Sequence, residues 1–234
     1  EGIVNGASFA PGATPVAPGS LLSVFGVNLT EVSAVAASLP LPRELAGVKI
    51  LVGGLEAPLV AAVAEAGPGY DQILFQLPVE LGTATYADVV VVNNGVISGA
   101  EGLSLAPAVP AAFTISQQGT GAAAALHGDF APVSATRPAR PGQTILLFAT
   151  GLGPVRPPAA SGEPPAALST VAGGVALTIG GRPARLLFAG LAPGFVGLYQ
   201  INVTVPEGLP SGEAELLVSV DGISSGEGVT IPIG

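Results

Sequence analysis

The chain contains an internal repeat, and this feature constrains its fold more than any other. Four sequence blocks occur twice, in the same order. The pairs are PGSLLSVFGVNL (18–29) with PGQTILLFATGL (141–152), GVKILVGGLEAPL (47–59) with GVALTIGGRPARL (174–186), DQILFQLP (71–78) with YQINVTVP (199–206), and VVVVNNGVIS (89–98) with LLVSVDGISS (216–225). The first pair is 123 residues apart and the others 127 or 128. This repeat predicts a duplicated domain, so the 234 residues divide into two units.

Each unit has the hydrophobic pattern of short β-strands. Runs such as VKILV, DQILFQL and AELLVSV are rich in aliphatic and β-branched residues, and turn residues follow them. Strands of this kind at regular spacing predict an all-β sandwich. The segment PAVP (107–110) ends the first copy, and we predict domains at 1–109 and 110–234. Only residues 39–45 have helical character, and we expect a single turn there at most.

Two kinds of turn recur between the strands. Asn94-Gly95 and Asp221-Gly222 occupy matching positions, and such pairs favour the type I′ hairpin turn because both central residues need a positive φ. Gly53-Gly54 and Gly180-Gly181 form a second matched pair. The Pro-rich segment 154–168 has no such match, and we expect an ordered loop without helix.

The composition excludes several classes of function. The formal net charge is −9, and the seven basic residues are scattered along the chain, so a cationic face for nucleic acid or an anionic membrane is not expected. The chain has no Cys, which excludes disulfides and thiolate metal sites. Its apolar runs are too short for a membrane span. We therefore expect no nucleic-acid partner, no membrane span, no metal and no cofactor.

Three segments resemble a known bacterial family. ATGLGPV (149–155), GLAPGFVGLYQINVTVP (190–206) and NGASF (5–9) are similar to the uncharacterised Solibacter-type C-terminal domain, which is found mainly in exported acidobacterial proteins. Each half also resembles the immunoglobulin-like IPT/TIG domains of surface proteins. The resemblance implies two tandem immunoglobulin-like β-sandwich domains, secreted or at the cell surface, and no established catalytic residue. We expect that a leader was removed before Glu1 or that the chain is a fragment.

Searches for catalytic and metal motifs argue against an enzyme. Residues 222–226 (GISSG) match the G-x-S-x-G pattern, but a strand-like segment follows and the single His, His127, comes earlier in the chain. His127 and Asp129 are too few for a zinc site, so we interpret His127 as a solvated loop residue. The Asp residues lack the spacing of a calcium loop. Gln72 and Gln200 match between the copies and predict a shared structural hydrogen bond.

Two functions remain open. The first is a structural subunit of a surface filament, layer or adhesin that self-associates by β-strand addition through a terminal strand. The candidate assembly residues are Ile3, Val4, Phe9, Val229, Ile231 and Ile233, although each terminal strand could equally pair within its own domain. The second is a polysaccharide- or surface-binding accessory module of a larger exported protein. An exposed row of Tyr70, Tyr86 and Phe195 would favour it.

The unmatched segments are the best candidates for a specific contact surface. They are residues 127–129, the loop 154–168, the segment GLAPGFVG (190–197) and the two chain ends. Asn28 and Asn202 lie in N-x-T sequons, which matter only if the host glycosylates them. The repeat also suggests a two-module rod.

Overall fold

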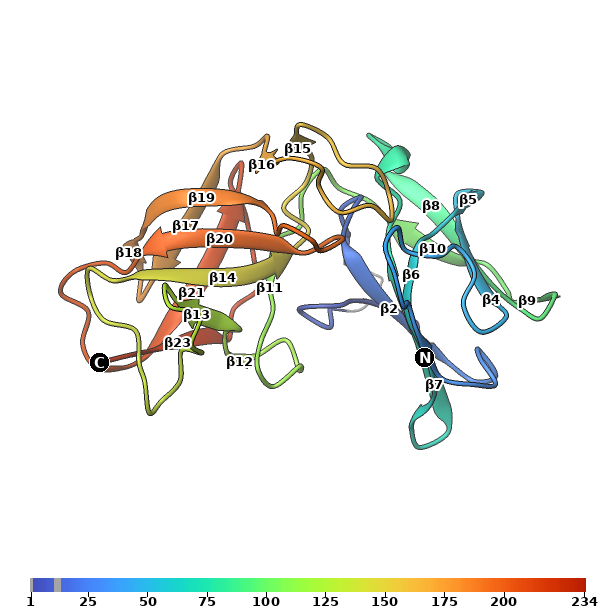
Figure 1. Cartoon of the computed structure of the whole chain (residues 1–234), viewed down its shortest axis with the longest axis horizontal. Helices are drawn as coiled ribbons and strands as arrows, with labels where there is room; N and C mark the ends of the chain where they lie inside the picture. Colours follow the sequence, from blue (N-terminus) through green and yellow to red (C-terminus); the bar gives the residue numbers. More distant parts are fainter. Residues whose placement is uncertain (1, 11–13) are drawn as a thin grey trace.

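The chain folds into two tandem immunoglobulin-like β-sandwich domains (Figure 1). The computed structural model describes residues 2–10 and 14–234. Glu1, at the start of the predicted N-terminal assembly strand, lies outside the described residues. In that described part, no helix is long and apolar enough to cross a membrane.

Two five-stranded sheets form the first domain. One sheet has the order β1 (Gly2–Asn5), β2 (Leu21–Gly26), β7 (Tyr70–Gln76), β6 (Leu59–Gly67) and β3 (Ala34–Val35). The other has the order β10 (Glu101–Ser104), β8 (Tyr86–Asn93), β4 (Val48–Val52) and β5 (Leu55–Glu56), with β9 (Val96–Ile97) paired to β8.

The second domain repeats this plan with additional short strands. One sheet has the order β11 (Ala111–Ala112), β14 (Thr144–Thr150), β20 (Tyr199–Thr204), β19 (Arg185–Leu191), β16 (Thr170–Val171) and β15 (Val155–Arg156), with β13 (Ala125–His127) on β14. The other has the order β12 (Gly121–Ala122), β23 (Val229–Ile233), β21 (Gly212–Val220), β17 (Val175–Ile179) and β18 (Arg182–Pro183), with β22 (Ile223–Ser224) on β21.

The four repeated sequence blocks form the equivalent central strands of the two sandwiches. β2 pairs with β7 and β4 with β8, as β14 pairs with β20 and β17 with β21. Burial alternates along β4, β8, β20 and β21, which is the pattern expected when one face of each strand packs against the opposite sheet. The local sequence pattern therefore specifies both sandwiches.

Each domain has its own hydrophobic core. Leu22 and Phe75 of one sheet and Ile50 of the other belong to the core of the first domain, and Leu147 and Ile201 belong to the core of the second. All of these side chains are at most 1% exposed. Burying one such side chain favours the folded domain by roughly 1.5–3 kcal/mol relative to leaving it exposed.

The predicted turns form, and residues 39–45, where we expect one helical turn at most, contain none. Asn94 and Gly95 have φ values of 47° and 84°, and Asp221 and Gly222 have 48° and 85°, as a type I′ turn requires. Residues 39–45 are irregular because Pro40 and Pro42 lack the N–H groups that a helical turn needs. The described helical turn is instead η1, a 3-10 helix at Val79–Leu81. Segment 154–168 is an ordered loop carrying the short strand β15.

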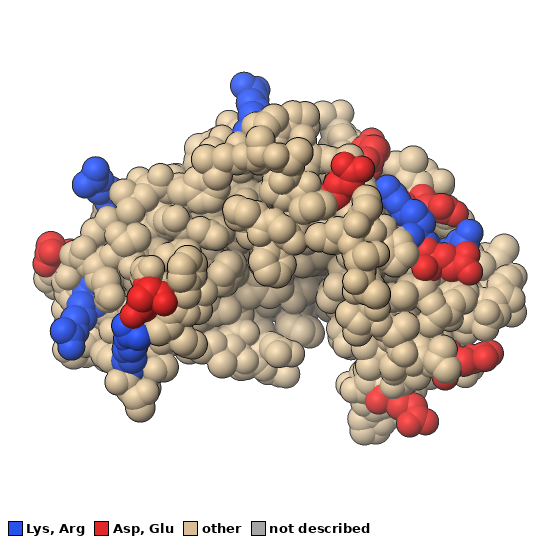
Figure 2. All heavy atoms as spheres, in the orientation of Figure 1, with Lys and Arg blue, Asp and Glu red and all other residues tan. Residues whose placement is uncertain are grey.

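The two domains make a bent arch rather than a straight rod. Figure 1 shows them joined along one side, with their other ends apart. In the space-filling view, a hollow lies between the two free ends, and the Lys and Arg side chains do not gather into one patch on the visible face (Figure 2). The geometry of the joint therefore sets the shape of the molecule.

Candidate functional site at the interdomain joint

A buried threonine connects the two domains at the end of β14. The Thr150 hydroxyl donates to the carbonyl oxygen of Gly197 at 3.0 Å and accepts from the backbone N–H of Leu21 at 2.9 Å. Thr150 is fully buried, so these bonds are shielded from water. One side chain thereby links the start of β2 in the first domain to the β19–β20 loop in the second.

The glycines of the ATGLGPV motif let the interdomain linker lie directly on β14. A Cβ atom at Gly151 would lie 2.1 Å from the carbonyl oxygen of Val109, and one at Gly153 would lie 2.7 Å from that of Pro107. The Val109 N–H donates to the Gly151 carbonyl oxygen at 2.8 Å. No side chain fits in these contacts, so the motif is explained by close backbone packing.

Tyr199 connects the GLAPGFVGLYQINVTVP segment, in which it lies, to the ATGLGPV segment. Its hydroxyl donates to the carbonyl oxygen of Gly153. Burial raises the pKa of the Tyr199 hydroxyl far above its usual value, so the group remains protonated and remains a donor. The bond ties the start of β20 to the loop that follows β14, which holds the second domain's half of the joint in place.

The loop 154–168 reaches across to the first domain. We call its tip, Ser161 and Gly162, the clasp. The Ser161 hydroxyl donates to the Glu80 carboxylate and accepts from the Val79 N–H at 2.8 Å. The Gly162 N–H donates to Oε1 of Gln76 at 2.8 Å.

The clasp is also bonded on its other side, by the segment that precedes β4. The Gly162 carbonyl oxygen accepts from the Leu41 N–H at 2.8 Å, and the Ser161 carbonyl oxygen accepts from the Arg43 guanidinium at 3.1 Å. Both clasp residues are buried. A buried tip with its polar groups bonded on both sides fixes the loop on the first domain.

Glu80 carries its negative charge in this contact. Partial burial acts to raise its pKa. The hydrogen bond from the Ser161 hydroxyl, the backbone N–H groups of Glu80 and Ser161, and the Arg43 guanidinium together outweigh that effect. The pKa of the Glu80 carboxyl is therefore held below its usual value. The clasp contact is thus strongest when Glu80 is ionised.

A cavity of about 400 Å³ lies beside the clasp, between the domains. Its buried floor comes from Leu105 of the first domain and from Leu191 and Tyr199 of the second. The loop residues Ala159 and Glu163, on either side of the clasp, line one wall. The joint therefore encloses space that neither domain forms alone.

The predicted assembly residues lie in strands that pair inside this chain. Ile3 and Val4 are in β1, which pairs with β2 at the edge of its sheet. Val229, Ile231 and Ile233 are in β23, which lies between β21 and β12. Ile3 and the three β23 residues are at most 5% exposed and belong to their own cores.

Phe9 lies beyond β1, with a φ of 55°. The turn containing it approaches the second domain, because a Cβ atom at Gly119 would lie 2.1 Å from the carbonyl oxygen of Ser8. In the single chain, the N-terminal segment thus pairs within the first domain, and its turn also approaches the second domain. Strand exchange between copies stays a prediction.

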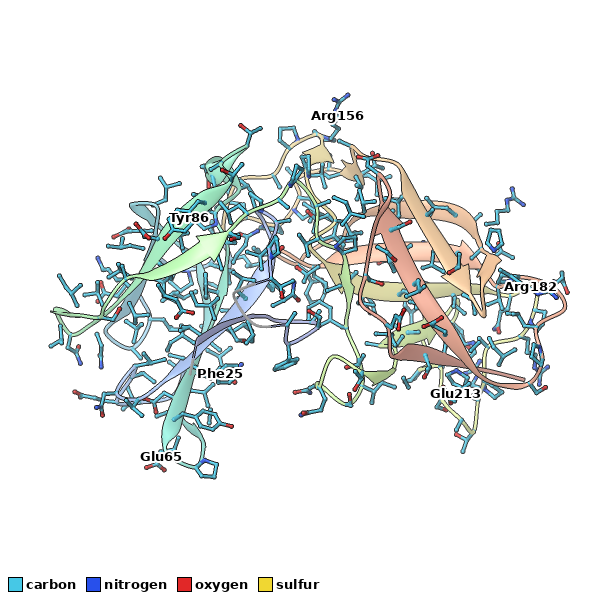
Figure 3. All side chains as sticks on the ribbon, turned by 180° about the vertical axis from the view of Figure 1, so that it is seen from behind. Phe25, Glu65, Tyr86, Arg156, Arg182 and Glu213 are labelled. Carbon is cyan, nitrogen blue, oxygen red and sulfur yellow. The ribbon has the colours of Figure 1, made fainter. Side chains whose placement is uncertain are left out.

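The aromatic row does not form. Tyr70 is on β7 and packs edge-on against Phe25, with ring centroids 5.7 Å apart. Tyr86 is on β8 in the opposite sheet, where its hydroxyl donates to Asp88 at 2.8 Å. Figure 3 shows Tyr86 well away from Phe25. Phe195, the third member of the predicted row, is exposed in the β19–β20 loop of the second domain, so the three residues come from separate elements.

The solvated-loop interpretation of His127 is wrong. His127 is on β13, is 2% exposed, and its Nε2 is 3.1 Å from the carbonyl oxygen of Arg137. Its position in a strand that covers the core explains its burial. Asp129 instead pairs with Arg137 at the surface.

The two matched glutamines do not make the same bond. Gln72 donates to the Ser23 hydroxyl of the neighbouring strand, whereas Gln200 donates to Asn202 of its own strand. The reason is that Leu146 occupies the position equivalent to Ser23 and has no hydroxyl to accept the bond.

The G-x-S-x-G match forms part of a β-hairpin. This agrees with the prediction made from the strand-like segment that follows it. Gly222 lies in the type I′ turn and Ser224 on β22, and the Ser225 hydroxyl accepts from the Val218 N–H at 3.1 Å. The Ser98 hydroxyl accepts from Val91 N–H in the same way in the first domain. Among the described residues, no group of three or more His, Cys, Asp or Glu side chains is placed to hold a metal ion.

Sequence comparison within the chain could have indicated part of the joint. Thr150 and segment 154–168 differ from the first copy, and unmatched positions are where a contact made only once must lie. Glu80 and Gln76 also differ from their counterparts, Gly208 and Thr204, but nothing near them in the sequence indicates that they contact segment 154–168. Glu80 lies in η1 and Gln76 at the end of β7, and they are 81 and 86 residues from their partners in the clasp.

No family model and no curated protein matches the chain. Among solved structures, it is similar to SGBP-B of the Bacteroides ovatus mixed-linkage glucan utilization locus, in complex with a mixed-linkage heptasaccharide. The identity is 14% over 96% of this chain and 45% of that one, and the TM-score is 0.37.

It is also similar to the I9–I11 tandem of titin, with 10% identity, 100% and 64% coverage and a TM-score of 0.24. Domains 4–9 of the surface layer protein SbsC match with 12% identity, 86% and 22% coverage and a TM-score of 0.24. The chain therefore spans less than two thirds of the length of each of these proteins. Such values give no ligand or partner for this chain.

Proposed function

We propose that the chain is a non-enzymatic structural module of an exported bacterial protein, and that it holds two β-sandwiches at a fixed angle. The observation that carries this proposal is the buried clasp, in which Ser161 and Gly162 of the second domain bond to Glu80 and Gln76 of the first. Thr150 adds a second buried link. Domains in tandem move relative to each other unless their interface prevents it, so these links favour a rigid spacer.

Small-angle X-ray scattering with NMR relaxation tests this role. We expect one rotational correlation time for both domains of the wild type. The double variant Thr150→Val, Ser161→Ala keeps the side-chain shapes but removes the bridging hydroxyls, and it should give a larger radius of gyration and two separate correlation times. Ser224→Ala, at an exposed hairpin position, is the control. Independent tumbling of the wild-type domains would contradict the proposal.

The finer proposal is that copies of the chain self-associate through a terminal strand. β1 supports this better than β23, because β1 lies at a sheet edge whereas β23 has a neighbour on each side. An edge strand can leave its sheet and pair with another copy at a lower cost than an internal strand. Such assembly would make the module a subunit of a surface filament or layer.

A cysteine pair can identify the partner of β1, because the chain contains no Cys. Ile3 lies opposite Val24 in the β1–β2 register, so the variant Ile3→Cys, Val24→Cys crosslinks β1 to whichever β2 it pairs with. Strand exchange predicts a ladder of crosslinked chains on a non-reducing gel. The control pair Leu177→Cys, Val218→Cys joins two central strands and should crosslink only within one chain. Crosslinked monomer alone in both variants would refute exchange and leave the rigid joint standing.

A further inference from the structure

The cavity between the domains has the size and position of a small-molecule site. Its volume of about 400 Å³ is within the range of ligand pockets, which commonly lie at domain interfaces. Two glycines help to leave this space open, because Gly19 and Gly197 line the cavity without side chains. A Cβ atom at Gly19 would lie 3.8 Å from the Tyr199 hydroxyl oxygen.

Most of the lining is apolar. Leu105, Leu191 and the Tyr199 ring form the buried floor, and four prolines (Pro18, Pro107, Pro154 and Pro158) line the cavity around it. Prolines present ring carbons and have no N–H group to satisfy. Removing an apolar molecule from water into such surroundings is favourable by roughly 25 cal/mol per Å² of buried apolar surface.

A few polar groups provide orientation. Gln76 is 4% exposed, and its Oε1 accepts from Gly162 while its Nε2 lies 3.5 Å from the Gly19 carbonyl oxygen, at the limit of a hydrogen bond. The carboxamide therefore retains an N–H for a ligand. The Tyr199 hydroxyl donates to Gly153 and retains a lone pair.

The charge of the lining is negative. Glu163 is the single charged residue among the described residues that line the cavity, and no Lys, Arg or His lies in that set. An anionic ligand would leave water for an apolar lining that offers no cation, and exposed Glu163 would repel it, so its affinity is reduced. A neutral or cationic ligand is not opposed in this way.

We propose that this cavity binds a small, largely apolar molecule that is neutral or cationic and carries a hydrogen-bonding group. The site exists only while the clasp holds, because Pro158, Ala159 and Glu163 are on the same loop as Ser161 and Gly162. A bound molecule that contacts both domains would in turn stabilise the joint. This inference does not depend on self-association or export.

A pair of related fluorescent dyes tests the proposal. Phenylnaphthylamine is neutral, apolar and carries one N–H, and anilinonaphthalene sulfonate adds a negative charge to the same rings. We expect one equivalent of phenylnaphthylamine to bind with enhanced fluorescence. The sulfonate should bind at least about tenfold more weakly, because the apolar lining cannot replace the water around its charge and Glu163 repels it. Glu163→Gln should strengthen sulfonate binding severalfold and leave phenylnaphthylamine binding within about twofold.

Two variants that fill the cavity test whether the dye binds there. Ala84→Trp fills the space from the first domain and Ala159→Trp from the second, and each should weaken phenylnaphthylamine binding by about tenfold or more. Ala176→Trp, on the exposed face of β17, is the matched control and should bind as the wild type does. The proposal is overturned if the wild type does not bind phenylnaphthylamine, if both dyes bind equally, or if both filling variants fold and bind normally.

Discussion

Asp71 and Tyr199 occupy equivalent positions in the two copies. Each bonds to the equivalent loop of its own domain, but Asp71 accepts hydrogen bonds and Tyr199 donates one. The Asp71 carboxylate accepts from the N–H groups of Glu65, Leu29 and Thr30 at 3.0, 2.8 and 3.4 Å. The Tyr199 hydroxyl instead donates to the carbonyl oxygen of Gly153. In each copy, a buried group at the start of the strand thus fixes the loop that follows β2 or β14. Matched positions need not carry matched residues, because the loop offers both donors and acceptors.

We predict that Asp71→Asn destabilises the first domain by roughly 1–3 kcal/mol, because the amide nitrogen cannot accept a hydrogen bond and leaves a backbone N–H unpaired. Urea denaturation at neutral pH measures the change. Asp88→Asn, at an exposed position, is the control and should change stability by less than about 0.5 kcal/mol.

The effect of Asp71→Asn should depend on pH. The backbone N–H of Glu65 lowers the Asp71 pKa, burial opposes it, and the N–H groups of Leu29 and Thr30 lower it further. The carboxylate therefore stabilises the fold fully above its unfolded-state pKa of 3.8, and this contribution is lost as the pH falls through the lower folded-state value. The difference between wild type and variant should shrink in acid, and a difference that grows there would refute the assignment.

At the scale of elements, the hairpins show which features each sandwich needs. The type I′ turns at Asn94-Gly95 and Asp221-Gly222 recur with nearly equal φ values, and the serines that follow, Ser98 and Ser225, accept equivalent backbone N–H bonds. These features are local to one hairpin, so the amino-acid pattern was sufficient to predict the turns. The joint, by contrast, is made of elements that the two copies do not share.

We predict that Gly222→Ala lowers the stability of the second domain by about 1 kcal/mol, because alanine is strained at a φ of 85°. Gly226 follows the same hairpin, has open space where a Cβ atom would lie and has no positive φ, so Gly226→Ala is the matched control and should be nearly neutral. Thermal unfolding followed by circular dichroism measures both. Equal losses in the two variants would contradict the turn assignment.

At the scale of the whole molecule, the joint is asymmetric and cannot simply be repeated by another copy. Val27 occupies the first-domain position equivalent to Thr150 and has no hydroxyl. Glu207 and Gly208 follow the third repeated block where Val79 and Glu80 follow it in the first copy. The free ends of the two domains thus lack the groups that make the clasp, which explains why this contact occurs once in the chain.

We predict that acid loosens the arch. Glu80 has a lowered pKa, so its bonds to Ser161 are fully present above its unfolded value of 4.5 and are lost as the pH falls through the lower folded-state value. Small-angle scattering should show the radius of gyration increasing as the pH falls below that range. Glu80→Gln does not titrate and should show little change over the same range. An identical response in both proteins would assign the effect to other carboxyl groups.

The number of sandwiches, their central strands and their hairpin turns could all be predicted from the amino-acid sequence. The strands and turns depend on residues close together in the chain, such as the alternation along VKILV and the Asn94-Gly95 pair, and the repeat sets the number of domains. The arch, the cavity and the burial of His127 could not be predicted in this way. Each depends on groups that meet only after folding, as Ser161 meets Glu80 across 81 residues. No pattern within either segment encodes such a contact, because its energy arises from hydrogen bonds and burial that neither segment has alone.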